Sequence, residues 1–512
     1  MSQKYQALAG DSQIWKEHYY NRFVRPRASR LPGLKDVGVS PVSLQFASKA
    51  SRWLEDEHLV KRGVKTNWKR QYKLRHNWAK GSCGVKEIQV AEQAPVPPVL
   101  VQMHDSVIYL ADQANGLRAW STKGPRKILA QTAFISDHTN APPTSIAVDT
   151  QAADDGCSTV VVGFENGAFS LYKLRQQDAR FVHTYSHEPS VNGVISAVAI
   201  SGHYVVTMTA TQLLSLYQFS ATERRPTIKL DSPRLLHSLK SHTVWPPLSA
   251  TLRSSTSSIV VSIAYALPTY LSGWTVGIQE VKVSSDGDFL ESRLASAIDQ
   301  HYRPLAFAAP PMMHHLTPLA TGSLATSTGL ELRHIHAKPI SLSYTHPYLL
   351  VSHPDNTLAL YLVNSTTDSL SISAGSRLWG HTSSVSGAHV GSRGKAVSVS
   401  RGGDELRVWE LEGGFASSSA RKRLATGDLS VRIRADVRDR SVVADVRPHV
   451  GLDLIGHALA GKARNGSCAV ESRQDPSELT LSRGWIGFDE ENVVVLKEQN
   501  QGRQALVVYD FT

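Results

Sequence analysis

Two groups of histidines are the side chains in this 512-residue chain whose spacing could support chemistry. They are the pair His314-His315 and the stretch Arg333-His334-Ile335-His336. In a strand, His334 and His336 would share one face, as two ligands of one metal ion do. No cysteine or acidic cluster stands beside either group. Packed or surface histidines are therefore expected, and no metal site is predicted.

The sequence lacks the motifs of cofactor binding and covalent catalysis. It contains no G-x-x-x-x-G-K-[ST] phosphate loop, no G-x-G-x-x-G fingerprint, no G-x-S-x-G elbow and no H-E-x-x-H pair. The stretch from Gly391 to Lys395 is too short for a phosphate loop and is predicted to be a hairpin turn. No C-x-x-C pair exists, which argues against a zinc site and a disulfide framework; the cysteines are Cys83, Cys157 and Cys468. We expect a protein that is not an enzyme and has no cofactor.

The length and charge of the chain limit its class. A chain of 512 residues allows two to four ordinary domains or one large repeat architecture. No apolar run approaches the ~18–20 residues that span a bilayer, and the first residues lack an apolar signal core. These features predict a cytoplasmic and/or nuclear protein that makes no membrane contact.

The net charge of +11 lies in one segment. Residues 1–90 hold 18 Lys or Arg against 7 Asp or Glu, a balance of +11, and the other 422 residues are neutral on balance. A basic arm on a neutral body indicates contact with an acidic protein surface or with nucleic acid. The alternative is a solvated basic helical face.

The basic segment is predicted to be helical. In residues 4–24 the apolar side chains recur every three or four positions, with Asp11 or Ser12 as the cap of a helix opening at Gln13. A second helical block covers residues 48–75, and Gly81 is a plausible stop beyond it. Tryptophans interleave with basic residues here, as in nucleic-acid binders, but their helical spacing favours packing, so nucleic-acid binding is not predicted.

Beyond residue 88 the helical spacing gives way to short β-type runs that repeat. Each unit has an apolar strand, a polar turn with Gly, Asn or Asp, and an alternating strand that ends in Trp or Tyr. The spacing is 45 residues between Tyr172 and Tyr217 and 48 between Tyr361 and Trp409, close to the ~40–45 residues of a propeller blade. The units lie at residues 106–120, 159–172, 204–217, 348–361, 396–409 and 487–510.

These repeats predict a mainly β protein in which residues 89–512 form a β-propeller of seven or eight blades. A single blade cannot bury both of its faces, so many copies must close into a ring. The closing aromatics, among them Trp120 and Tyr172, are expected to pack between blades. The repeat pattern is absent at residues 225–340 and 415–480, where we expect long loops or irregular blades.

The clearest repeat, residues 378–410, resembles a WD repeat. It carries Gly380-His381 early and Trp409-Glu410 at its end. In that family a His, a Ser or Thr, an Asp and a Trp form a buried hydrogen-bonded set within the blade. The resemblance implies that His381 and Trp409 belong to such a set. Asp404, five residues before Trp409, departs from the family spacing of six.

The N-terminal segment resembles the back half of an F-box. Residues 5–16 read as a helix, an acidic turn and an Ile-Trp-Lys, and residues 67–81 are similar to the linker of fungal F-box/WD-repeat proteins. The resemblance divides the chain into residues 1–33 (the F-box part), 34–88 (a basic linker) and 89–512. The front half of an F-box would lie before Met1. Either the true start of the protein therefore lies upstream of Met1, or adaptor binding is lost. The implied adaptor-binding residues are Leu8, Ile14, Trp15 and Tyr19.

Together the two resemblances imply the substrate-recognition subunit of an SCF-type E3 ubiquitin ligase. Its partners would be the SCF adaptor subunit, the cullin and a target protein whose identity the sequence does not reveal. Such families often read phosphorylated peptides with arginines on one propeller face, and the candidates here are Arg118, Arg401 and Arg407. The alternatives are a WD-repeat scaffold of another assembly, and an enzyme or nucleic-acid binder that uses a propeller face.

Overall fold

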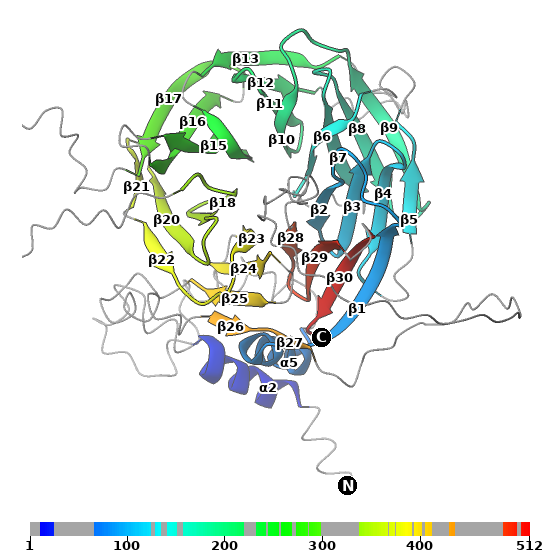
Figure 1. The fold of residues 1–512 in the computed structure, drawn as a ribbon, viewed down its shortest axis with the longest axis vertical. Helices are drawn as coiled ribbons and strands as arrows, with labels where there is room; N and C mark the ends of the chain where they lie inside the picture. The colour runs from blue at the N-terminus through cyan, green and yellow to red at the C-terminus, as the bar shows by residue number, and fades with distance from the viewer. Residues whose placement is uncertain are drawn as a thin grey trace, which may run out of the picture.

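The described residues of the computed structural model form a ring of β-sheets with a pair of helices at its rim (Figure 1). They are residues 11–24, 66–123, 128–134, 141–150, 157–219, 232–241, 244–254, 258–268, 273–284, 286–297, 337–366, 368–373, 375–391, 394–401, 405–411, 430–435, 485–498 and 503–512. Within them lie seven sheets, so the predicted propeller is confirmed with seven blades. No helix among these residues has the length and apolar character needed to cross a membrane.

Each of the first three blades is a meander of four antiparallel strands in chain order. Blade 1 is β2 (Leu100–His104), β3 (Val107–Asp112), β4 (Gly116–Ser121) and β5 (Ile128–Thr132). Blade 2 is β6 (Pro143–Val148), β7 (Cys157–Phe164), β8 (Phe169–Arg175) and β9 (Arg180–His187). Blade 3 is β10 (Ile195–Ser201), β11 (Tyr204–Thr209), β12 (Leu213–Gln218) and β13 (Arg234–Lys240).

Blades 4 to 6 follow the same plan. Blade 4 is β14 (Trp245–Ser254), β15 (Ser258–Pro268), β16 (Trp274–Ser284) and β17 (Phe289–Ser296). Blade 5 is β18 (Ser341–Thr345), β19 (Tyr348–Ser352) and β20 (Leu358–Ser365), and its outer position is shared by β21 (Leu370–Ile372) and β22 (Ser376–Leu378). Blade 6 is β23 (Val385–Val390), β24 (Lys395–Ser400), β25 (Leu406–Glu410) and β26 (Ser430–Arg432).

Blade 7 joins the two ends of the chain. Its inner strands are β28 (Ile486–Phe488), β29 (Asn492–Glu498) and β30 (Gln504–Asp510), and its fourth strand is β1 (Ser82–Ala91). β1 pairs with β30 in antiparallel register from Gly84 opposite Asp510 onward, and it also pairs in parallel with the short β27 (Arg434–Ala435). The predicted boundary between residues 88 and 89 therefore falls inside β1, which belongs to the propeller.

The strand directions define two faces of the ring. The first strand of every blade starts at one face, which we call the start face, and the third strand starts there too because the strands alternate in direction. The opposite face, the helix face, carries the hairpins between first and second strands. The helix before β1 reaches the ring at this face, since β1 is a fourth strand.

Each seam between neighbouring blades holds its own apolar cluster. Seven clusters of buried residues correspond to the seven seams, including the seam between blades 7 and 1, where Ile88 and Leu506 meet Ile108 and Leu110. The alternating patterns arise because each strand presents one side to each neighbouring blade. Tyr172, which is 1% exposed, lies in the seam between blades 1 and 2 as expected of a closing aromatic.

The prediction of irregular structure at residues 225–340 is wrong for its central part. Residues 245–296 form blade 4, whose β15 and β16 each have 11 residues. The repeat pattern is not recognisable there because β16 ends in Lys-Val-Ser rather than in an aromatic residue. The segments 298–336 and 436–484 lie outside the described residues.

The N-terminal segment forms two packed helices. α2 (Ser12–Tyr19) continues into the π-helical turn η1 (Tyr20–Val24), and Asp11 is its N-cap, accepting a hydrogen bond from the Gln13 amide at 2.8 Å. α5 (Trp68–Lys80) stops at Gly81, which has φ +69° and lies so close to the Arg432 carbonyl that a Cβ would approach its oxygen to 2.6 Å. Of the predicted helical block at residues 48–75, residues 48–65 lie outside the described part of the chain.

Ring closure leads to a stability prediction. Leu506 on β30 is fully buried in the seam between blades 7 and 1, whereas Leu294 on β17 is 59% exposed. We expect Leu506→Ala to lower the free energy of unfolding by about 2–5 kcal/mol, because it removes apolar contacts and leaves a cavity. The matched control Leu294→Ala should change it by no more than about 0.5 kcal/mol. Urea unfolding followed by circular dichroism measures both, and equal effects would contradict a closed seam.

Candidate functional site

Blade 6 contains the hydrogen-bonded set that the WD-repeat resemblance implies. His381 precedes β23, Ser398 lies on β24 and Trp409 on β25. The Trp409 indole nitrogen donates to the Ser398 hydroxyl at 2.8 Å, and the same hydroxyl lies 2.6 Å from Nε2 of His381. A carboxylate faces Nδ1 of His381 and can only accept, so the imidazole proton belongs on Nδ1 and the Ser398 hydroxyl donates to Nε2. Ser398 on β24 therefore links β25, through Trp409, to the segment before β23, through His381.

Glu405 takes the acidic position of this set. Asp404, the acid implied by the resemblance, lies outside the described residues, and it is Glu405 Oε2 that lies 3.5 Å from Nδ1 of His381. Glu405 also accepts hydrogen bonds from the Thr382 amide and hydroxyl, both at 2.9 Å, and from Nε of Arg407 at 2.9 Å. Glu405 stands four residues before Trp409, so the acid of this blade also departs from the family spacing of six.

Burial controls the ionisation of the set. Desolvation lowers the pKa of His381 to about 4, against the opposing charge of Glu405. For Glu405 desolvation raises the pKa, but the hydrogen bonds from Thr382 and Arg407 outweigh it and lower the pKa to about 2. At neutral pH the set thus consists of a neutral imidazole and an ionised carboxylate.

The other two predicted blade residues close different seams. Tyr172 packs edge-on against His183, with ring centroids 5.3 Å apart, and burial raises the pKa of its hydroxyl to about 12. Trp120 lies at the end of β4, partly buried in the seam between blades 7 and 1. Both therefore serve packing between blades.

Two of the three arginines considered for phosphate recognition are internal. Arg118 is 5% exposed and donates to Asp112 at 2.6 Å and to the Val90 carbonyl at 3.1 Å. Arg407 is held by Glu405, and Arg401 alone of the three is exposed. The first two stabilise their blades and cannot offer a free guanidinium to a phosphopeptide.

Blade 4 uses a different polar contact, which sequence reasoning missed. Glu280 on β16 is 1% exposed and accepts from Arg253 at 2.8 Å, from Arg293 at 3.2 Å and from Ser365 at 2.7 Å. Ser365 belongs to blade 5, so this carboxylate links two blades. The strand pattern gives no signal for it, because these three partners lie on three other strands, β14, β17 and β20.

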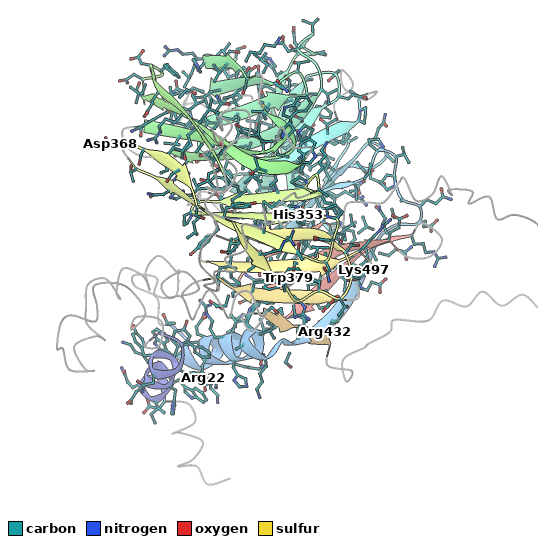
Figure 2. The ribbon with its side chains drawn as sticks, turned by 60° about the vertical axis from the view of Figure 1, so that its left-hand side comes forward. Arg22, His353, Asp368, Trp379, Arg432 and Lys497 are labelled. Carbon is teal, nitrogen blue, oxygen red and sulfur yellow. The ribbon has the colours of Figure 1, made fainter. Side chains whose placement is uncertain are left out.

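The helical pair, which we call the arm, is held together by aromatic rings. Tyr19 of α2 lies with its ring 5.4 Å from that of Trp68, and Trp15 lies 5.3 Å from Tyr72. Arg22 of η1 donates to the Tyr72 hydroxyl at 2.6 Å. Figure 2 shows Arg22 at the arm end of the molecule, beyond Arg432 of blade 6.

The arm is joined to the propeller at the seam between blades 6 and 7. The ring of Trp78 stacks on Phe511 at 4.0 Å and its nitrogen donates to the Glu490 carbonyl at 2.9 Å. Asn77 donates to the Phe511 carbonyl at 2.8 Å, and Arg70 pairs with Glu491 at 2.6 Å. These contacts all lie on the helix face, so α5 and the ring form one packed body.

The implied adaptor-binding residues are not equivalent in the structure. Tyr19 is 1% exposed inside the contact between α2 and α5, so it cannot lie on a free surface in this arrangement. Trp15 and Ile14 are half-buried, and Leu8 lies outside the described residues. The structure therefore removes Tyr19 from the surface set.

The described residues hold no group of three or more His, Cys, Asp or Glu arranged to bind a metal ion. The histidines at 314, 315, 334 and 336 lie outside these residues.

Removing the central serine tests the set in blade 6. Ser398→Ala leaves the Trp409 N–H and Nε2 of His381 buried without a partner, so we expect a loss of about 2–4 kcal/mol in the free energy of unfolding. Ser238→Ala, at an exposed position on β13, is the matched control and should change little. Chemical denaturation provides the comparison, and similar values for the two variants would rule out a structural role for the set.

The neutral His381 predicts a pH dependence. Its pKa of about 4 lies below the unfolded value of 6.5, so the stability it contributes is complete above pH 6.5 and is lost as the pH falls toward 4. Between pH 7 and pH 5 this loss should reach about 2 kcal/mol. His381→Gln should show a shallower fall over this range than the unsubstituted chain. Parallel curves of unfolding free energy against pH would exclude this role for His381.

Comparison with solved structures finds matches at low sequence identity. Sqt1 of Saccharomyces cerevisiae is 10% identical with a TM-score of 0.39, and the match covers 83% of this chain and 97% of that one. The WD40 β-propeller domain of Doa1 is 9% identical with a TM-score of 0.34, covering 83% and 95%. YCF48 from Cyanidioschyzon merolae is 8% identical with a TM-score of 0.38, covering 83% and 98%. Likeness at this level carries no inference about function.

Comparison of sequences is more specific. The chain is similar to F-box protein pof12 of Schizosaccharomyces pombe (strain 972 / ATCC 24843), with 24% identity over 319 residues, which are 61% of this chain. The match spans 60% of the length of that relative. The family model described as "F-box protein pof12 beta-propeller" matches residues 83–512, from the second residue of β1 onward. The chain therefore belongs to the F-box protein pof12 β-propeller family.

Proposed function

We propose that this chain is a substrate-recognition subunit of an SCF-type E3 ubiquitin ligase, in which the arm docks the adaptor subunit and the propeller holds a target protein. Membership of a family named for an F-box protein supports the proposal. Such a subunit performs no chemistry. It raises the local concentration of the target near the ubiquitin-loaded enzyme and fixes its orientation.

The observation that carries the proposal is the packed connection between arm and ring. Trp78 stacks on Phe511 and Asn77 bonds to the Phe511 backbone, while Trp68 and Tyr72 hold α2 on the other side of the same helix. A single helix thus contacts both bodies. A partner bound to α2 would keep a fixed orientation relative to the propeller, which a flexible linker could not ensure.

On the arm, the proposed adaptor contact uses Ile14 and Trp15. Both are half-buried and lie on α2, the helix furthest from the propeller. Tyr19 is excluded from this contact because it is part of the core between the helices. The adaptor surface is therefore proposed to lie on α2 around Ile14 and the part of Trp15 that remains accessible beside its contact with Tyr72.

The target is proposed to bind the start face. Large apolar side chains are exposed on connections at this face, which lies opposite the docking face of α5. Tryptophan in particular is enriched among residues that dominate binding energy. The exposed residues are Val96 (82%), Val191 (104%), Trp245 (45%) and Trp379 (42%).

Affinity purification of the full chain from cells tests the proposal. The adaptor and the cullin should both be recovered, and Ile14→Asp should reduce their recovery roughly tenfold, because it places a charge in an apolar contact. Val191→Asp is the matched control on the start face and should leave their recovery unchanged. Circular dichroism checks that each variant is folded. If the folded, unsubstituted chain recovers neither adaptor nor cullin, the SCF role fails, and a scaffold role outside ubiquitination takes its place.

A further inference from the structure

The arm carries an exposed ridge of positive charge along one side of α5. Successive residues of a helix are about 100° apart, so Lys69, Lys73 and Lys80 fall within a narrow sector of α5. The ridge they form is about 16 Å long. All three side chains are exposed. The ridge lies between the side of α5 that meets the propeller, marked by Leu74 and Trp78, and the side that meets α2.

Arg22 extends the ridge onto the second helix. It lies over the ring of Tyr72, at 5.5 Å from the ring centroid, and Tyr72 stacks on His76. Burial and the positive charges of Arg22 and Lys80 lower the pKa of His76, which places both cations around this imidazole. We call Arg22, Lys69, Lys73 and Lys80 the basic ridge.

The basic ridge has little acidic compensation. α5 contains no Asp or Glu, and Arg70, on its propeller side, forms a salt bridge with Glu491. Among the described residues, Lys73 and Lys80 make no salt bridge. Glu17, the acidic residue of α2, lies about half a turn away from Trp15 and Tyr19 and so points away from α5. Lys73 and Lys80, with the exposed Lys69 and Arg22 beside them, thus concentrate positive charge on one side of the arm, an arrangement that attracts an acidic partner.

The packing of the aromatic rings in the arm favours an acidic protein segment over single-stranded nucleic acid as the partner. Trp68 and Trp78 are buried, and Trp15 and Tyr72 are half-buried with their rings packed against each other, so these four residues offer no fully exposed ring on which an unpaired base could stack. Single-stranded nucleic acid binding usually needs such stacking platforms. The four-residue step from Lys69 to Lys73 places their charges about one helical turn apart, the same step that separates carboxylates at positions i and i+4 of a facing helix.

We propose that the basic ridge is a docking surface for an acidic helical segment of a partner protein, with carboxylates repeated at one-turn spacing. The contact is electrostatic, so it acts mainly on the rate and orientation of encounter and weakens with salt. It does not depend on the SCF role. It would serve any partner that approaches the helix face beside blades 6 and 7.

The test uses a fluorescent alanine-based peptide of about 20 residues, long enough to be helical, with glutamate at every fourth position. It should bind the full chain at low salt, and a glutamine version should not. The double variant Lys73→Glu with Lys80→Glu should weaken binding at least roughly tenfold. The control double variant Lys173→Glu with Lys240→Glu makes the same charge change at exposed positions of blades 2 and 3. It should weaken binding less than about twofold.

Three results would overturn the proposal. They are no binding of the glutamate peptide at about 50 mM salt, an equal loss in both double variants, and tighter binding of a DNA duplex of about 20 base pairs than of the peptide. Recovery of adaptor and cullin is measured separately with the unsubstituted chain. Loss of adaptor and cullin recovery would contradict the SCF role, whereas loss of peptide binding would contradict the basic ridge, so the two failures can be told apart.

Discussion

The pairing of β1 with β30 is the constraint on which the rest of the molecule depends. A blade is a single sheet and cannot bury both of its faces, so the seven blades are stable only when each seam is filled. Six seams form between blades that follow one another in the chain, but the seventh needs segments about 400 residues apart in the chain to meet. β1 supplies the outer strand of the last blade and, with Ile88 and Val90, part of the apolar filling of that seam.

Closure also explains where the arm sits. β1 is a fourth strand, so the residue before it emerges at the helix face, and Gly81 in its left-handed conformation turns α5 back across the seam between blades 6 and 7. Trp78 then meets Phe511, the residue directly after β30. The strand that closes the ring and the helix that carries the arm are thus two parts of one continuous connection. The blades themselves differ in their polar contacts: blade 6 uses Ser398 with His381, whereas blade 4 uses a buried carboxylate, Glu280.

The sequence alone predicts those parts of the fold that depend on neighbouring residues in the chain. Alternation of apolar residues and turns marks the strands, and Asp11 and Gly81 mark helix ends because capping is local. Blade 4 was missed because its third strand lacks the closing aromatic, and β1 was assigned to the linker because a strand on its own shows no partner. Glu405 and Glu280 could not be found from spacing. Their roles depend on side chains from several strands, which only the folded arrangement brings together.

The stacking of Trp78 on Phe511 has a consequence for how the protein is made. During synthesis α5 is made early, but its docking surface is built from Glu490, Glu491 and Phe511, which are translated about 400 residues later. An unfinished or prematurely terminated polypeptide therefore has nothing on which to seat its arm. The arm can therefore take its place on the ring only after blade 7 has been made, so its docking comes late in the assembly of the fold.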